Sequence, residues 1–568
     1  MKMKKTTLIS LFFLLILSMS LKSQDIDVPE WRKRKYLSEE EMYKTVTNRG
    51  FEETAPPAGE VRFPAEYEPM QAVMIVYPLG IPVELVREMA EDCKVIVVVD
   101  TYKQEAARNA FVSADVNMDN IEYLNAPTNS YWIRDFGPWY IFDGKEPAIV
   151  DNKYNRPRPN DDELPGHFAE YWNIPMYGMN VVHTGGNMMQ DGFGVGVSDD
   201  IVITESASQA GITEAQVYEK MKSYLGIDPY HVTIDPQGDY IAHVDCWGKF
   251  LAPDKIMLAR VPKSNPRYQY YEEVADYFMN TNCSWGYPYK VYRVDIPGGN
   301  IVSPYTNSLI LNNKVLVPMG QYSTFNEAAL ELYREAMPGY EVIGVENKSA
   351  WDGWLNTDAL HCRTRGVMDF DMFYVDHREV LFGEQKWQDS IAITSKFIAY
   401  SGADLKHDSL LIYYRIDDGD YKTAKMTATG NPDEYVGYIK GYQGKSKVDY
   451  YVFGADESGH NRQQPVFGKL DPHSFTMEPH TESLPTFDVD RMAFDEAYFE
   501  IYPNPANDFV KLSVYSRHPS VLRIYNVMGI LVEEIEVNSK EIEIDVSDYD
   551  TGVYFFNIEG QISKLIRK

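Results

Sequence analysis

Short strand-like runs that alternate with helical runs are the feature of this 568-residue chain that most restricts its fold. Residues 72–77 (AVMIVY) form an apolar run of strand length, and residues 95–99 (VIVVV) form another. Between them, residues 82–90 have the apolar spacing of an amphipathic helix, with Pro82 at its first turn. This order predicts a β-α-β unit.

Helical patterns of the same kind recur further along the chain. Residues 213–225 precede Gly226, residues 327–337 precede Pro338, and strand-like sequence follows each of them. The chain also exceeds the ~250–300 residues that one hydrophobic core can serve. We therefore expect several domains, of which residues 58–385 form an α/β domain of repeated small units.

The composition changes after about residue 385. Five β-rich runs follow, at residues 391–400, 410–416, 421–426, 435–442 and 447–454. Turns separate these runs, so we expect an immunoglobulin-like β-sandwich over residues 386–475. Residues 476–497 are rich in Pro, Ser, Thr and acidic residues and predict a linker. Residues 498–568 are again β-rich and predict a small C-terminal β-sandwich.

The first 23 residues have the pattern of a secretory signal peptide. Lys2, Lys4 and Lys5 precede an apolar run at residues 8–17, and small residues end the segment. The run is shorter than the ~20 apolar residues of a spanning helix, which disfavours a membrane anchor. Residues 24–57 are polar and are expected to be a mobile or removable extension. With no later candidate span, the mature chain is expected outside the cytoplasm.

The charge balance excludes one class of partner. The chain has 54 basic and 84 acidic residues and a formal net charge of −30. Because phosphate binding needs a basic surface, we expect no nucleic-acid partner. The acidity would attract a cationic substrate, and it is equally consistent with the solubility of an exported protein.

Four cysteines occur in the chain: Cys93, Cys246, Cys283 and Cys362. None has CxxC spacing, which disfavours a zinc site and a thioredoxin-type redox motif. In an oxidising compartment a disulfide among the first three is one expectation, and buried thiols are the other. Cys362 differs because it lies in the motif HCRT at residues 361–364.

Cys362, His243, Asp135 and Asp245 together suit the hydrolysis of a guanidinium group. Its central carbon needs a strong nucleophile, its delocalised charge needs anions, and the departing ammonia needs an acid. Carboxylates accept guanidinium N–H groups in a fork geometry, which assigns Asp135 and Asp245 to the cation. His243 and Asp245 would leave the same face of an extended strand. We expect Cys362 to attack and His243 to act first as acid and then as base.

Each of these residues also has a structural explanation. A lone cysteine is more often a small buried apolar residue. A histidine near an aspartate on a strand is often a structural pair, and Arg134 with Asp135 can form a plain ion pair. The joint occurrence of the four residues favours the catalytic interpretation.

Four motifs resemble those of guanidine-modifying enzymes: WIRDFGP at 132–138, GGN at 185–187, HVD at 243–245 and HCRT at 361–364. The set is similar to bacterial secreted peptidylarginine deiminases over about residues 55–465, with agmatine deiminases as more distant relatives. The resemblance implies a pentein-like α/β propeller of five ββαβ blades around a central site. It also implies that Cys362 is the nucleophile, His243 the acid and base, and Asn307 a further catalytic residue. Asp135 and Asp245 match the guanidinium ligands.

The segment NRPRPNDD at residues 155–162 distinguishes between substrates. Its prolines hold two arginines in an extended stretch that suits a carboxylate. The resemblance implies that Arg156 binds the free carboxylate of a C-terminal arginine, with support from Arg158. Agmatine has no carboxylate, so the segment favours peptidyl or free arginine; the alternative is a solvated loop paired with its own aspartates. The resemblance also places pocket-lining side chains at Trp132 and Tyr240.

The C-terminal module carries a second resemblance. YPNP at residues 502–505, GVY at 552–554 and the basic end are similar to the sorting domain that the type IX secretion machinery reads. This implies that the chain crosses the outer membrane and is released or attached at the surface. The alternative is a second sandwich that only stabilises or binds.

The sequence as a whole predicts a secreted peptidylarginine deiminase that converts protein or peptide arginine to citrulline, preferably at a C-terminal arginine. Agmatine deiminase is the alternative enzyme, because FGP at 136–138 looks closer to that group, and a non-enzymatic exported binding protein is the other class. No cofactor or metal is expected. Asp115 to Asp119 mimic the start of an EF-hand loop, but Asn120 replaces its glycine and Ala126 its glutamate, so no calcium requirement is predicted.

Overall fold

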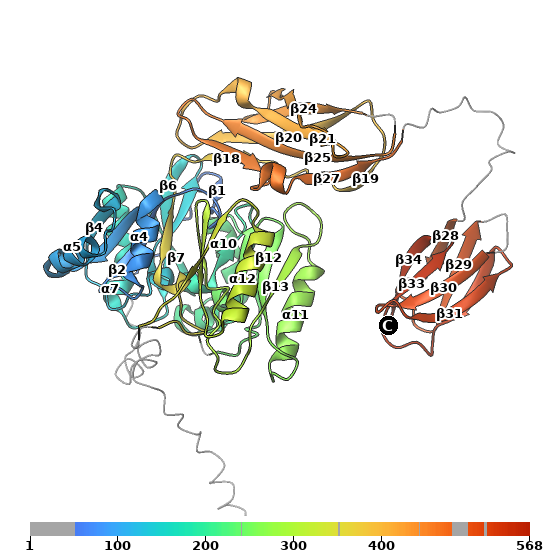
Figure 1. Ribbon diagram of the computed structural model, residues 1–568, viewed down its shortest axis with the longest axis horizontal. Coiled ribbons are helices and arrows are strands. Elements are labelled where there is room, and N and C mark those ends of the chain that lie inside the picture. The colour runs from blue at the N-terminus through green and yellow to red at the C-terminus, as the bar shows by residue number, and fades with distance from the viewer. Residues whose placement is uncertain (1–50, 240, 350–352, 442–443, 480–497, 516–519) are drawn as a thin grey trace, which may run out of the picture. The chain divides into compact units, whose positions relative to one another are not determined.

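The computed structural model describes residues 51–239, 241–349, 353–441, 444–479, 498–515 and 520–568 (Figure 1). The chain divides into two compact units, Met1–His480 and Thr481–Lys568. The expected signal peptide, most of the expected extension, Tyr240 and most of the expected linker lie outside the described residues.

The expected β-α-β unit is present at the start of the first unit. Strand β2 (Met70–Tyr77), helix α4 (Val83–Asp92) and strand β3 (Lys94–Val99) follow one another, with Pro82 at the N-cap of α4. β2 and β3 pair in parallel, and β17 (Arg365–Met368) pairs antiparallel with β2. The end of the α/β region therefore closes onto its beginning.

The described α/β region repeats one strand arrangement in five sheets. In each, an antiparallel pair is followed by a helix and a strand parallel to the second member of the pair. The closing sheet combines β17, β2, β3 and β4 (Ile121–Asn125). The others are β5 (Trp139–Asp143), β6 (Glu146–Tyr154) and β7 (Met176–His183) with β1 (Val61–Arg62); β8 (Met189–Gln190), β9 (Gly196–Asp199) and β10 (Tyr230–Thr233); β11 (Gly248–Ala252), β12 (Lys255–Arg260) and β13 (Lys290–Asp295); and β14 (Leu309–Leu311), β15 (Lys314–Pro318) and β16 (Glu341–Val345).

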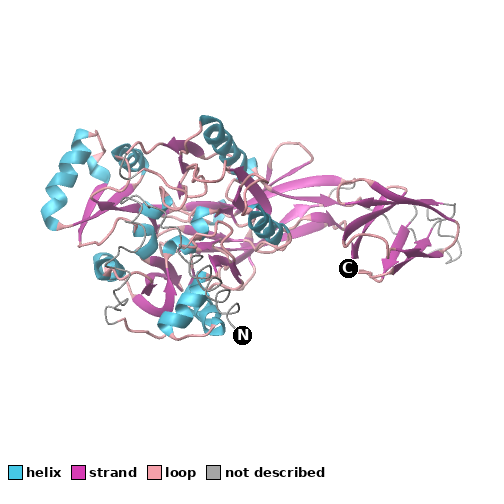
Figure 2. Cartoon of the chain, turned by 90° about the horizontal axis from the view of Figure 1, so that it is seen from below, coloured by secondary structure: helices cyan, strands magenta, loops and turns pink. Residues whose placement is uncertain are grey.

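The helices of this region lie around the outside of the strands (Figure 2). They include α8 (Leu164–Trp172), α10 (Glu214–Leu225), α11 (Tyr268–Met279) and α12 (Ser323–Ala336). α10 has the predicted ends, because Thr213 and Gln216 form a capping box and Gly226 follows in a left-handed conformation. α12 begins before the predicted residue 327, since Tyr322 at its N-cap provides no side-chain cap that the sequence could signal.

The β-rich part of the first unit consists of two sheets over a shared core. One sheet has the order β18 (Phe373–Asp376), β20 (Ser390–Ala399), β24 (Glu434–Lys440) and β23 (Thr427–Ala428). The other joins β19 (Gly383–Gln385), β27 (His473–Met477), β25 (Ser446–Ala455), β21 (Leu411–Ile416) and β22 (Lys422–Lys425), with β26 (Asn461–Gln464) beside β25. β18 and β19 precede the expected boundary at residue 385, yet they pair with strands that follow it.

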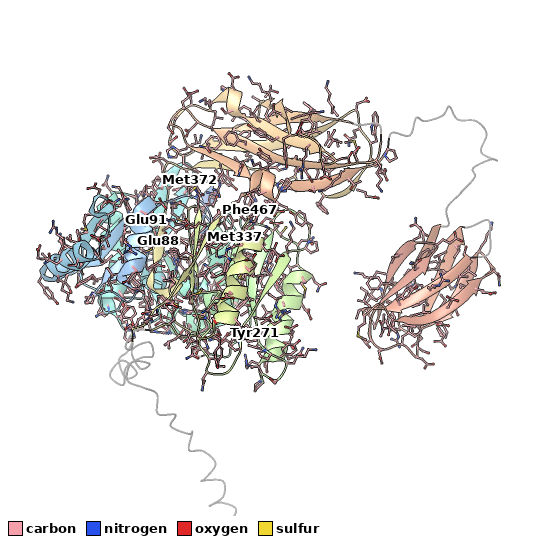
Figure 3. All side chains as sticks on the ribbon, viewed as in Figure 1. Glu88, Glu91, Tyr271, Met337, Met372 and Phe467 are labelled. Atoms are coloured by element: carbon pink, nitrogen blue, oxygen red, sulfur yellow. The ribbon has the colours of Figure 1, made fainter. Side chains whose placement is uncertain are left out.

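The β-rich part packs against the α/β region. Phe467 shares a buried cluster with Met337 at the end of α12, and both are labelled in Figure 3. Lys255 donates to Asp471 at 2.7 Å and to the Ala336 carbonyl at 2.7 Å. This contact of apolar and charged groups explains why the two parts form one compact unit.

The second unit has its own two sheets. One contains β28 (Tyr498–Tyr502), β29 (Phe509–Tyr515) and β32 (Glu541–Asp545); the other contains β31 (Leu531–Val537), β30 (Ser520–Asn526), β33 (Gly552–Ile558) and β34 (Gln561–Arg567). Leu522, Phe556 and Leu565 are fully buried among its described side chains.

Candidate active site

Cys362 lies in a short 3-10 turn, His361–Arg363, and its side chain is buried. Two side chains fix this turn. The Arg363 guanidinium binds the Asp358 carboxylate at 3.0 and 2.8 Å, and the Thr364 hydroxyl donates to the Leu360 carbonyl at 2.9 Å. Bidentate pairs of this kind restrict orientation as well as position, so the sulfur is held in one place.

Asn307 contacts Cys362 on both its backbone and its side chain. The Asn307 Nδ2 group donates to the Cys362 sulfur at 3.2 Å. Its Oδ1 accepts from the backbone N–H of Cys362 at 3.3 Å and of His361 at 3.0 Å. This amide can therefore stabilise negative charge on the sulfur while it fixes the turn.

Asp245 also lies near the sulfur, in the 3-10 turn Val244–Cys246. The Cys362 thiol faces its Oδ2 at 3.8 Å, and His361 Nδ1 lies 2.7 Å from the same oxygen. The backbone carbonyl of Asp245 accepts from the Thr306 hydroxyl at 3.2 Å. The carboxylate is thus fixed next to the nucleophile.

His243 and Asp135 form a second pair. His243 Nδ1 lies 3.6 Å from Asp135 Oδ1, and Nε2 lies 2.9 Å from the Thr184 hydroxyl. His243 is the N-cap of the turn that holds Asp245, so the expectation that both lie on one extended strand is wrong. The contacts of the two side chains differ: His243 lies near Asp135 and Thr184, whereas Asp245 lies near His361 and Cys362. Asp135, in α6 (Ile133–Phe136), retains 15% side-chain exposure.

The arginine segment is folded rather than solvated. The Arg158 guanidinium stacks 4.9 Å over the Trp132 ring, and both residues are buried. Asp161 in α7 (Pro159–Asp162) is fully buried and accepts from Asn129 and Ser130, so the expectation of a solvated loop is wrong, although Arg158 does attract Asp161. Arg156 is partly exposed, and Tyr240 lies outside the described residues.

Two contacts of this site involve residues to which the sequence assigned no role: Glu66 and Thr184. Glu66 binds His361, Arg134 and Lys249. Burial raises the pKa of Glu66, but these three cations lower it more, so its pKa lies well below the usual value. An isolated Glu or Thr carries no motif, so only the three-dimensional contacts identify them.

Three further features of the described residues concern the cysteines, metal binding and membrane-spanning helices. The four cysteines are buried thiols, so no disulfide joins Cys93, Cys246 or Cys283. Among the described residues, no group of three or more His, Cys, Asp or Glu side chains is arranged to hold a metal ion. Nor does that part of the chain contain a helix long and apolar enough to cross a membrane.

A thiol, an imidazole and carboxylates on a mixed α/β fold suit covalent hydrolysis, and the deiminases, which hydrolyse C–N bonds of amidines, are a class of enzymes with this chemistry. The chain belongs to the family of Porphyromonas-type peptidyl-arginine deiminases, whose model matches residues 62–367. The α/β region is therefore a pentein-like deiminase domain, followed by a β-rich C-terminal region.

Two curated relatives share 24% identity with the chain and carry the name "Putative agmatine deiminase". The match to the Vibrio parahaemolyticus protein covers 55% of this chain and 98% of the relative. The match to the Legionella pneumophila protein covers 43% and 74%. A solved structure of the same description is 20% identical, covers 56% of this chain and 99% of its own, and has a TM-score of 0.51; this likeness concerns the fold.

The C-terminal unit has a match of its own. Residues 500–568 match the secretion system C-terminal sorting domain. The expected type IX sorting domain is thereby confirmed, and it implies the secretion machinery as a partner. A chain with this domain is secreted or attached to the cell surface.

Proposed function

We propose that the chain is a peptidyl-arginine deiminase that converts the arginine guanidinium of proteins or peptides to citrulline, with a preference for C-terminal arginine. The observation that carries the proposal is the arrangement of Asn307, Cys362 and Asp245, with 3.2 Å and 3.8 Å from sulfur to amide nitrogen and carboxylate oxygen. In a deiminase family, this arrangement supports the predicted nucleophile and its neighbours.

The carboxylates orient the substrate. Asp135 and Asp245 accept the guanidinium N–H groups, which neutralises the cation and presents its planar carbon to Cys362. Asn307 donates to the sulfur and stabilises its thiolate form.

The reaction proceeds in two balanced halves. The Cys362 thiolate adds to the guanidinium carbon, and the C=N electron pair moves onto nitrogen. His243 protonates one terminal nitrogen, the C–N bond breaks, and ammonia leaves an S-linked amidinium. His243 then takes a proton from water, whose oxygen adds to the same carbon. The C–S bond breaks, the hydroxyl proton of the adduct passes to bulk water as its C=O forms, the thiolate returns, and the ureido group of citrulline is released.

The two arginines support a substrate with a carboxylate. Arg158 is held against Trp132 at 4.9 Å, and Arg156 two residues earlier is partly exposed. Together they offer planar donors for the carboxylate of a C-terminal arginine. Trp132 and Tyr240 are proposed to line the pocket. Agmatine is the second candidate substrate, because the curated relatives are named for it.

The proposal also covers the parts of the chain outside the site. The five sheets of residues 58–385 are the blades of a propeller, the following β-rich part is immunoglobulin-like, and residues 1–23 are a signal peptide. The repeated strand, strand, helix and strand order supports the first of these assignments.

Replacement of the nucleophile tests the reaction. Cys362→Ala should lower the rate of citrulline formation by at least ~10³-fold, because it removes the sulfur that forms the proposed covalent intermediate. Mass spectrometry of an arginine peptide would detect the exchange of one =NH for one =O. Cys93→Ser, a change at a buried thiol at the end of α4, is the control and should keep activity. Equal activity of Cys362→Ala and the wild type would exclude the mechanism.

Replacement of Arg156 tests the substrate. Arg156→Ala should lower kcat/KM for a peptide with C-terminal arginine by about 10- to 100-fold, because a charge-assisted contact is lost. The same change should leave kcat/KM for agmatine within about twofold. A wild-type enzyme that prefers agmatine would contradict the peptidyl-arginine assignment.

A further inference from the structure

The Glu66 carboxylate lies at the meeting point of four segments of the deiminase domain. Its Oε1 accepts from Lys249 Nζ at 2.7 Å and from the Ile310 N–H at 2.9 Å. Its Oε2 lies 2.9 Å from Arg134 Nη2 and 2.6 Å from His361 Nε2. These four groups belong to β11, β14, α6 and the nucleophile turn. One carboxylate therefore connects strands of two sheets and helix α6 to the turn that carries Cys362.

His361 connects this carboxylate to the site. Its Nε2 lies 2.6 Å from Glu66, and its Nδ1 lies 2.7 Å from Asp245 Oδ2. A carboxylate oxygen only accepts, whereas a neutral imidazole has a single N–H. Both contacts are satisfied at once when the ring carries both protons, as the imidazolium cation.

The charges around the ring decide whether it keeps the second proton. Burial is the largest effect and, with repulsion from Arg134 and Lys249, holds the pKa of His361 below its usual value, although Glu66 and Asp245 raise it in part. Arg365 and His361 line one small cavity. Burial, and after it repulsion from Arg134, lowers the pKa of Arg365 to about 9. The imidazolium therefore depends on the two carboxylates that the ring contacts.

We infer that Glu66 and His361 are positioning residues for the deimination reaction, which fix the Asp245 carboxylate and keep it ionised next to Cys362. The inference rests on the proposed function. Neither residue has to touch the substrate. The His361 N–H contact with Oδ2 restricts rotation of the Asp245 carboxyl group, and the imidazolium charge offsets the repulsion between Asp245 and a thiolate at 3.8 Å.

Three variants test this arrangement. Glu66→Gln keeps the side-chain shape but removes the charge, so its amide can donate to a neutral His361. His361→Gln leaves the other three contacts of Glu66 in place. The matched control is Glu68→Gln: Glu68 is also buried, pairs with Arg62 and accepts from the Ala65 N–H at 2.8 Å.

Kinetics provide the first measurement. Glu66→Gln and His361→Gln should lower kcat/KM by about 10- to 100-fold, as residues that orient a reactive group do. The acid limb of the pH profile should move to higher pH, because Asp245 has lost the cation that favours its ionised form. Glu68→Gln should keep the wild-type limb. Wild-type profiles in both site variants at matched thermal stability would overturn the inference.

Nuclear magnetic resonance of protein with ¹⁵N-labelled histidine provides a measurement that needs no catalysis. The signals absent from His361→Gln identify this ring. They should show that the ring loses its second proton at a lower pH in Glu66→Gln than in the wild type, because the variant lacks the carboxylate charge that raises the pKa of His361. The same titration midpoint in the two proteins would overturn the inference. Absence of any deimination by the wild type would instead defeat the proposed function, and the ring charge would still be determined.

Discussion

Gly186 sets the space between His243 and Asp135. A methyl group at this position would lie 2.5 Å from His243 Nδ1 and 2.7 Å from Asp135 Oδ1, which is too close for any carbon atom. Gly186→Ala should therefore separate the imidazole from the carboxylate. We expect kcat/KM to fall by about 100-fold, since small displacements of reacting groups have effects of that size.

Gly166→Ala is the matched control for this change. Gly166 lies in α8, and nothing lies within 4 Å of the methyl group that alanine would add. This variant should keep wild-type kcat/KM and gain slightly in stability, because alanine favours a helix interior. Steady-state kinetics and thermal unfolding of both variants check the comparison. Unchanged activity in Gly186→Ala would show that the contact between His243 and Asp135 does not matter.

Several site residues were predictable from chemistry and spacing, and others were not. Cys362 and Asp245 were expected at one site, and their 3.8 Å contact agrees with that hypothesis. The direction of His243 was not predictable, because the i and i+2 argument assumes a strand where the chain forms a turn. Glu66 precedes Cys362 by almost 300 residues, so its role depends on sheet closure, which no local pattern encodes.

At the level of elements, Asp161 connects α7 to the segment before α6. Its carboxylate accepts from the N–H groups of Asn129 at 2.6 Å and Ser130 at 3.1 Å, and from the Ser130 hydroxyl at 2.7 Å. Burial raises the pKa of Asp161 to about 6 despite these bonds. The segment that carries Arg158 is therefore fixed by a carboxyl group whose ionisation is costly.

The raised pKa of Asp161 predicts that the stability of the folded chain depends on pH. Between pH 3.8 and about 6, folded Asp161 keeps a proton that the unfolded chain releases, so its contribution to stability falls as the pH rises. Asp161→Asn does not titrate and can still accept both N–H groups. Its stability relative to the wild type should increase by up to about 3 kcal/mol from pH 4 to 7. Urea unfolding at both pH values measures the difference, and a constant difference would contradict it.

Elements with terminal signals were the easiest to predict. α10 has Thr213 and Gly226 at its ends, and both appear in the sequence as start and stop residues. α12 lacks a capping side chain, so its first turn was missed. β18 and β19 were assigned to the α/β region because they precede residue 385, where the composition changes, and only their pairing with β20 and β27 places them with the β-rich part.

At the level of the whole molecule, hydrophobic cores divide as the two units do. Phe397, Val452 and Phe475 belong to a cluster within Met1–His480, whereas Leu522 and Phe556 belong to one within Thr481–Lys568. Each unit therefore has a buried apolar interior of its own, which is the physical requirement for independent folding.

Removal of residues 481–568 tests this division. The remaining chain should fold with an unchanged melting temperature, because none of the described hydrophobic clusters spans the cut. Its kcat/KM should stay within about twofold of the full chain, since the candidate site residues all precede the cut. Export should be lost, because the sorting domain is absent. Calorimetry, kinetics and cell fractionation check the three outcomes, and a truncated chain that aggregates would show that the first unit depends on the second.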